Sequence, residues 1–115
     1  MPGKSPRRNP LNSDKAIATI TSIATTELIA APGAGFHIKV LSISIVATAA
    51  NTVLLKSGAT SISPTWEWGA SGGGVGLQTL EDGWLECAEN EALNLTTTTT
   101  ARVSVICRYQ IVRGA

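Results

Sequence analysis

Alternation of apolar and polar positions dominates this chain, and it is strongest between Gly35 and Ala47. In that run, GFHIKVLSISIVA, the apolar residues are separated mostly by single residues, and many of them are β-branched. β-Branched side chains are stiff at χ1 and fit a pleated surface, so the run predicts a long central strand. The apolar parity changes between Val40 and Leu41. This change predicts a β-bulge, or a strand whose two halves are buried differently.

In the second half of this strand, Ser42, Ser44 and Val46 alternate with the apolar positions and therefore face the opposite side. Side chains of this size form a small, flat and weakly polar face, on which another subunit can pack closely. We therefore predict these three residues as an oligomer interface.

Shorter segments repeat the strand pattern on both sides of this run. Residues 16–31 allow a helix through Ile17, Ile20 and Ile23, but their many Thr and Ile residues and the following Pro-Gly pair favour two short strands. Further strands are expected at 52–56, 59–68, 75–80, 84–87, 93–99 and 103–111. Pro64 makes the second of these an edge or bulged strand, because proline cannot donate a ladder hydrogen bond.

The connections between these strands complete the expected fold. The segment 69–76, GASGGGVG, lacks the Gly-Lys-Ser/Thr ending of a phosphate loop and no helix pattern follows it, so it predicts a hairpin connection. Residues 93–111 alternate well and predict a half-buried antiparallel hairpin. Turn signals at this spacing indicate an all-β chain, a single antiparallel β-sandwich of the jelly-roll type with about eight strands.

Composition separates a basic arm from this domain. The 115 residues are enough for one domain, which we place at 15–115. Residues 1–14 hold three of the five prolines, and predict an extended arm that is either free or ordered on a partner. Lys4, Arg7 and Arg8 are its candidate binding residues. The body has no basic stripe typical of nucleic-acid binding, and the chain has no apolar run of the ~18 residues that a membrane span needs.

No group of residues predicts catalysis, a cofactor or a metal. The single histidine, His37, has no nucleophile elbow accompanying it. Cys87 and Cys107 lack the paired spacing of a zinc site, and are expected as two buried thiols or one disulfide between late strands. We expect the chain not to be an enzyme.

Acidic and aromatic residues gather in two short stretches. Five of the eight acidic residues form either a solvated edge or a receptor for the basic arm of another copy: Glu81, Asp82, Glu86, Glu89 and Glu91. Trp66 and Trp68 share one strand parity, so their rings can lie side by side as part of the core, as an interface anchor or as a platform for sugars.

The order of motifs resembles the small jelly-roll structural proteins of tailed bacteriophage virions. The resemblance rests on the run at 35–47, on VLLKSGATSIS at 53–63, and on GWLECAENEALNLTTTTTARVSVICRYQIV at 83–112. It implies a virion component, and capsid decoration or cement proteins are the most similar class. It also implies a homotrimer.

These observations lead to two hypotheses about function. The first is a decoration protein, made in the host cytoplasm, that binds the outside of the major capsid protein lattice and stabilises the head, with no nucleic-acid or membrane partner. The alternative is a tail or head-fibre module that binds host-surface glycans through the two tryptophans.

Overall fold

The computed structural model describes residues 14–80 and 82–113, and this part of the chain forms ten strands. They are β1 (Asp14–Ile20), β2 (Thr25–Ile29), β3 (Phe36–Ala47), β4 (Asn51–Ser57), β5 (Thr60–Ser61), β6 (Trp66–Trp68), β7 (Gly73–Leu77), β8 (Leu85–Glu86), β9 (Leu93–Thr97) and β10 (Val103–Arg113). No helix in these residues is long and apolar enough to cross a membrane.

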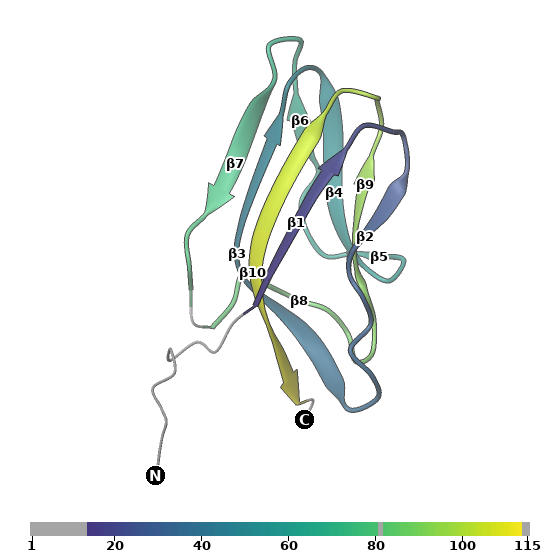
Figure 1. The fold of residues 1–115 in the computed structure, drawn as a ribbon, viewed down its shortest axis with the longest axis vertical. Helices are drawn as coiled ribbons and strands as arrows, with labels where there is room; N and C mark the ends of the chain where they lie inside the picture. Colours follow the sequence, from purple (N-terminus) through teal and green to yellow (C-terminus); the bar gives the residue numbers. More distant parts are fainter. Residues whose placement is uncertain (1–13, 81, 114–115) are drawn as a thin grey trace.

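The strands form two antiparallel sheets that pack face to face (Figure 1). Sheet A has the order β1-β10-β3-β7, and β8 also pairs with β3; sheet B has the order β2-β9-β4-β5, and β6 also pairs with β4. The chain changes sheet after β1, β2, β3, β6, β8 and β9. This two-sheet arrangement confirms the predicted antiparallel β-sandwich of the jelly-roll type.

The predicted central strand is β3, and it lies inside sheet A between β10 and β7. Opposite β10, Ser42 pairs with Arg108 and Val40 pairs with Tyr109, so Leu41 is an extra residue without a partner. The predicted bulge is therefore confirmed. The Leu41 side chain is fully buried but lies outside the main core cluster, and its carbonyl oxygen accepts a hydrogen bond from Leu80 N at 3.0 Å. The bulge thus anchors the segment after β7.

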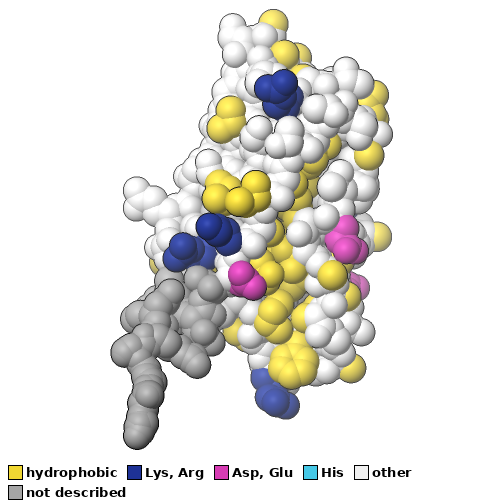
Figure 2. Space-filling view, in the orientation of Figure 1, with side chains coloured by type: hydrophobic (Ala, Val, Ile, Leu, Met, Phe, Trp, Pro, Cys, Tyr) yellow, Lys and Arg dark blue, Asp and Glu magenta, His cyan; other side chains and the backbone are white. Residues whose placement is uncertain are grey.

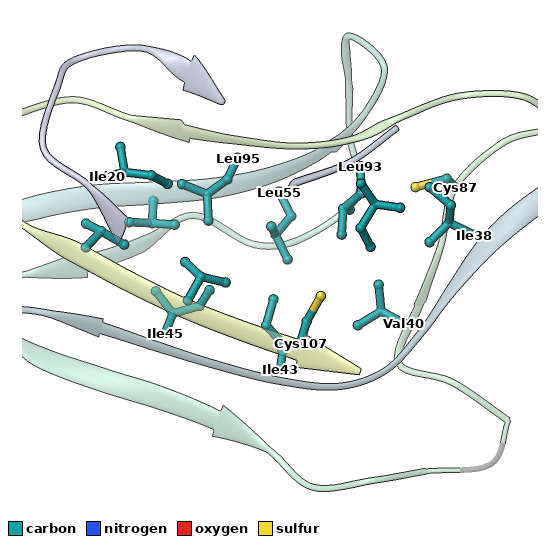
Figure 3. Packing of buried hydrophobic residues seen from close by; sticks show 14 of the residues in the cluster. Ile20, Ile38, Val40, Ile43, Ile45, Leu55, Cys87, Leu93, Leu95 and Cys107 are labelled. Atoms are coloured by element: carbon teal, nitrogen blue, oxygen red, sulfur yellow. The ribbon is translucent and has the colours of Figure 1, made fainter. Parts of the chain in front are cut away.

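The core lies between the sheets (Figure 3). From sheet A, Val40, Ile43 and Ile45 face the side chains of Leu55 and Leu95 from sheet B. Period-two alternation produces this arrangement, because one face of each strand points inward. Removal of these side chains from water is the main favourable contribution to folding, at roughly 25 cal/mol per Å² of apolar surface.

Two connections that were predicted as hairpins instead join strands of different sheets, so both predictions are wrong. The segments predicted as an antiparallel hairpin at 93–111 are β9 and β10, which lie in opposite sheets. Likewise, the glycine segment does not close a hairpin, because β6 pairs with β4 in sheet B while β7 pairs with β3 in sheet A. Alternation fixes which residues face inward, but it does not say which strand lies beside which.

Asn51 explains how the chain crosses between β9 and β10. Its side chain is buried at 3% exposure, and its Oδ1 accepts hydrogen bonds from Thr98 N at 3.1 Å and Thr99 N at 3.2 Å. Its Nδ2 donates to the carbonyl oxygen of Ala101 at 3.0 Å. One side chain thus satisfies backbone groups along the turn that links the sheets, which a hairpin would have paired directly.

The remaining strand predictions agree with the structure. The segment 16–31 forms strands β1 and β2 rather than a helix. The segment 59–68 is split into the short edge strands β5 and β6, with Pro64 between them. Here the hydroxyl of Ser63 accepts a hydrogen bond from Leu55 N at 2.9 Å, in place of a backbone carbonyl. The nine segments expected from the pattern therefore give ten strands, whereas about eight were predicted for the sandwich.

Candidate functional site

The outer face of sheet A exposes several large apolar side chains. Register places Ile17 beside Ile106, Ile106 beside Ser44, and Ser44 beside Gly76, so these four residues form one row across the sheet. The next row toward the end of β3 holds Val46. Ile17 is 70% exposed, Ile106 44% and Val46 49%. In Figure 2, hydrophobic and basic side chains lie close together on this side of the molecule.

A shallow groove of about 730 Å³ lies on this face. Its floor includes Ser42, Ser44 and Gly76, and its sides include Ile106 and Arg108. The groove exists because the outward positions of β3 and β7 carry small side chains or none, while those of β1 and β10 carry isoleucines. Such a shape suits a protein surface that packs by side-chain complementarity.

Two of the predicted interface residues, Ser42 and Ser44, line this groove, and the third, Val46, lies in the adjacent row. The structure therefore brings all three to one surface. Their role as an oligomer interface stays a prediction. The predicted arm residues Lys4, Arg7 and Arg8 lie outside the described residues, as does Glu81.

Basic residues border the groove at one end. Lys15 and Arg108 pair in register and extend the row that contains Ser42. Neither forms an ion pair with another residue in the described part of the chain. The end of the groove is therefore cationic.

Trp66 and Trp68 occupy a different place from this groove. Both are half-buried and pack against the core cluster from the edge of sheet B. Trp68 lies over Gly73, where an added Cβ would come within 2.6 Å of its Cδ1 atom. The Trp68 ring therefore contributes to packing between β6 and β7, while Trp66 packs against the core cluster.

Trp84 is the more exposed tryptophan, at 43%. Its indole Nε1 donates a hydrogen bond to the carbonyl oxygen of Gln78 at 2.5 Å, and its backbone N donates to Val40 O at 2.7 Å. These two bonds hold the segment between β7 and β8 against the bulge of β3.

Three of the five clustered acidic residues have partners within the chain. Glu89 Oε2 accepts a hydrogen bond from Gly35 N at 2.6 Å, and Glu91 Oε1 accepts one from the Ser57 hydroxyl at 2.6 Å. Glu86 Oε1 lies 3.5 Å from His37 Nε2. These contacts fasten the segment after β8 to the start of β3 and the end of β4. The carboxylates thus support the fold locally.

The side chains of reactive type are buried or dispersed. Cys87 and Cys107 are free and buried, so the expectation of two buried thiols is confirmed. Burial raises the pKa of each thiol from 9.0 to about 11. Among the described residues, no three His, Cys, Asp or Glu side chains come together in a way that could hold a metal ion.

The sequence pattern did not single out Ile17, Ile106, Lys15 and Arg108 as surface residues of interest. In β1, Ala16, Ala18 and Ile20 also alternate as apolar positions, and these face the core. Both faces of β1 are therefore apolar. Only the pairing of β1 with β10 shows that the isoleucine of the other parity is exposed.

Comparisons with known proteins give a distant similarity among solved structures. No protein-family profile matches the sequence, and no curated protein matches it. Among solved structures, the PRD1 vertex protein P5 is similar with a TM-score of 0.39 and 11% sequence identity, over 87% of this chain and 96% of that chain.

Proposed function

We propose that this chain is a structural protein of a bacteriophage virion, with a binding role rather than a catalytic one. The observation that carries the proposal is the agreement between the sequence resemblance and the fold. The motifs at 35–47, 53–63 and 83–112, which resemble those of small jelly-roll virion proteins, form β3, β4 with β5, and β8 to β10 of a two-sheet jelly roll.

Within that class, we propose a capsid decoration protein that binds the outside of the major capsid protein lattice and stabilises the head. Many copies that bind at once can stabilise a shell even when each contact is weak. The basic residues Lys4, Arg7 and Arg8 are proposed to contact the shell. The trimer that the resemblance implies is a separate prediction, which the mass of the purified protein tests.

The decisive experiment is to find where the protein lies on the particle. Virions of the phage that encodes this chain would be labelled with an antibody against the purified protein and imaged by electron microscopy. Label spread over the head is the expected result. Label confined to the tail would favour the glycan-binding alternative, and unlabelled particles would reject a virion protein altogether.

A truncation tests the role of the arm. A variant that lacks residues 1–13 retains every residue of β1 and is expected to fold. It should lose binding to heads from which the native protein has been stripped. A matched control replaces only Lys4, Arg7 and Arg8 by Gln in the full-length chain, and the same loss is expected. Full binding by both variants would remove the arm from the proposal.

A further inference from the structure

The row Ile17–Ile106–Ser44–Gly76 has large side chains in one half and a small side chain or none in the other. We call Ile17 and Ile106, on β1 and β10, the ridge, and Ser44 and Gly76, on β3 and β7, the trough. Register sets them side by side across sheet A, so the ridge and the trough have the same position along the strands. The two halves therefore have complementary shapes on a single face.

The two ridge side chains are largely exposed and add little to the packing of the described part of this chain. Ile17 is 70% exposed and Ile106 is 44% exposed, and they are adjacent in register. Isolated exposed apolar residues are normal, but neighbouring ones that form a patch beside a groove are typical of an interaction surface. This patch lies on the predicted interface face that also holds Val46 at 49% exposure.

Gly76 has no reason within the described structure to be glycine. It does not have a left-handed φ, and an added Cβ would meet nothing within 4 Å. Its neighbour Gly74 differs, because a Cβ there would lie 2.9 Å from the carbonyl oxygen of Ile45. Glycine weakens a strand interior, and often marks a place that another surface approaches closely. The trough is such a place.

Charged residues extend this face beyond the ridge. Lys15 and Arg108 continue the ridge side by one row, and they form no ion pair with another described residue. On the trough side, the uncharged Gln78 and Thr79 line the groove. Lys39 of β3 faces outward farther along the strand, and its side chain lies against Gly83. The cationic end of the ridge therefore lies beside uncharged polar residues.

We propose that a second copy of this chain packs on the outer face of sheet A around a two-fold axis. The axis runs parallel to the strands between β10 and β3, so that it exchanges β1 with β7 and β10 with β3. The ridge of each copy then lies in the trough of the other, and Lys15 of each copy lies toward Gln78 and Thr79 of the other. The shapes become complementary with this one axis, and the cations of each copy face polar groove residues, as a two-fold interface requires.

This proposal does not rest on the proposed function, and it differs from the trimer that the resemblance implies. A single second copy can cover both the ridge and the trough, because they lie on the same flat face. A ring of three would need each copy to present them to two different neighbours.

Sedimentation equilibrium of the full-length chain tests the proposal. The expected result is a mean mass that rises with concentration from 11.9 kDa toward twice that value. Ile106→Arg should weaken the dimer by about 30-fold or more, since a charge then occupies the centre of the interface. Gly76→Leu should weaken it comparably by filling the trough. Ile23→Arg is the matched control, because Ile23 is 65% exposed and lies in the turn between β1 and β2. It should leave the mass unchanged.

Circular dichroism and urea unfolding would verify that each variant is folded. A charge exchange then tests the axis itself: Gln78→Lys, which would face Lys15 of the other copy, should weaken the dimer, and Gln78→Lys with Lys15→Glu should restore it. A monomer at every concentration, a trimer, or a dimer that tolerates both Ile106→Arg and Gly76→Leu would overturn the proposal. A dimer that the charge exchange fails to restore would overturn the proposed axis.

Discussion

The two outer faces of the sandwich differ in how far they complete their own interactions. On sheet B, the rows across the strands are mostly polar: Thr25 pairs with Thr96, which pairs with Leu54, and Glu27 pairs with Asn94, which pairs with Lys56. The hydroxyls of Thr25 and Thr96 lie 3.0 Å apart, within hydrogen-bond distance. On sheet A, the equivalent rows hold exposed isoleucines, a bare glycine and two cations without an ion-pair partner in the described chain.

The two sheets thus share one core but have outer faces of different polarity. Both inward faces are mainly apolar, although the buried polar residues Asn51, Ser57 and Thr97 all belong to sheet B, and burial of apolar side chains stabilises both sheets. The outward face of sheet B has side chains that water solvates well, whereas that of sheet A exposes apolar area that a protein surface can cover. We expect substitutions in the core to affect the two sheets alike. Substitutions on the outer faces should affect them differently.

The largest effect is expected in the shared core. Ile45→Ala in sheet A and Leu95→Ala in sheet B should each lower the free energy of unfolding by about 2–5 kcal/mol, because each leaves a cavity at a fully buried position. Urea unfolding followed by tryptophan fluorescence measures both. A large loss for one and almost none for the other would contradict a single core between the sheets.

A smaller effect is expected at the crossing between the sheets. Asn51→Ala removes the partner of Thr98 N, Thr99 N and the carbonyl oxygen of Ala101, and should cost about 1–3 kcal/mol. Asn94→Ala is the matched control, because its amide donates a single hydrogen bond, to Gly58 O, on the more exposed face of sheet B. Equal losses for the two variants would show that the crossing does not depend on Asn51.

The two buried thiols predict the pH dependence of stability at high pH. The pKa of Cys87 and Cys107 rises from 9.0 to about 11 on folding, so the folded state favours the protonated thiols. Their contribution is therefore complete below pH 9 and is lost as the pH rises toward 11. Urea midpoints across this range should fall, and the fall should be smaller in a Cys87→Ala, Cys107→Ala double variant. An identical decline in that variant would assign the loss to other groups.

The smallest effect on stability, and the sharpest contrast between the faces, is expected from one arginine placed on each. Ser44→Arg on sheet A and Thr52→Arg on sheet B should each change the free energy of unfolding by no more than about 0.5 kcal/mol, because both positions are on outer faces. Only Ser44→Arg should abolish self-association in sedimentation experiments. If Thr52→Arg acted in the same way, the contrast between the faces would be wrong.

Local pattern was sufficient for several structural features. The bulge at Leu41 was predictable because a change of apolar parity within one strand requires an extra residue to keep both halves inward. The interruption at Pro64 was predictable because proline lacks a backbone donor. The placement of Ser42, Ser44 and Val46 on one outer face was predictable, since they share the outward parity of one strand.

The sequence by itself therefore determined that the chain is a β-sandwich, which residues of β3 face inward and where that strand bends. Only the tertiary structure decided that β9 and β10 lie in different sheets, that Ile17 rather than Ala18 is exposed, and that Ile106 lies beside Ser44. The physical reason is that side-chain alternation acts within a strand. The partner of a strand is chosen by backbone hydrogen bonds between segments far apart in sequence, and only that choice brings the ridge and the trough together.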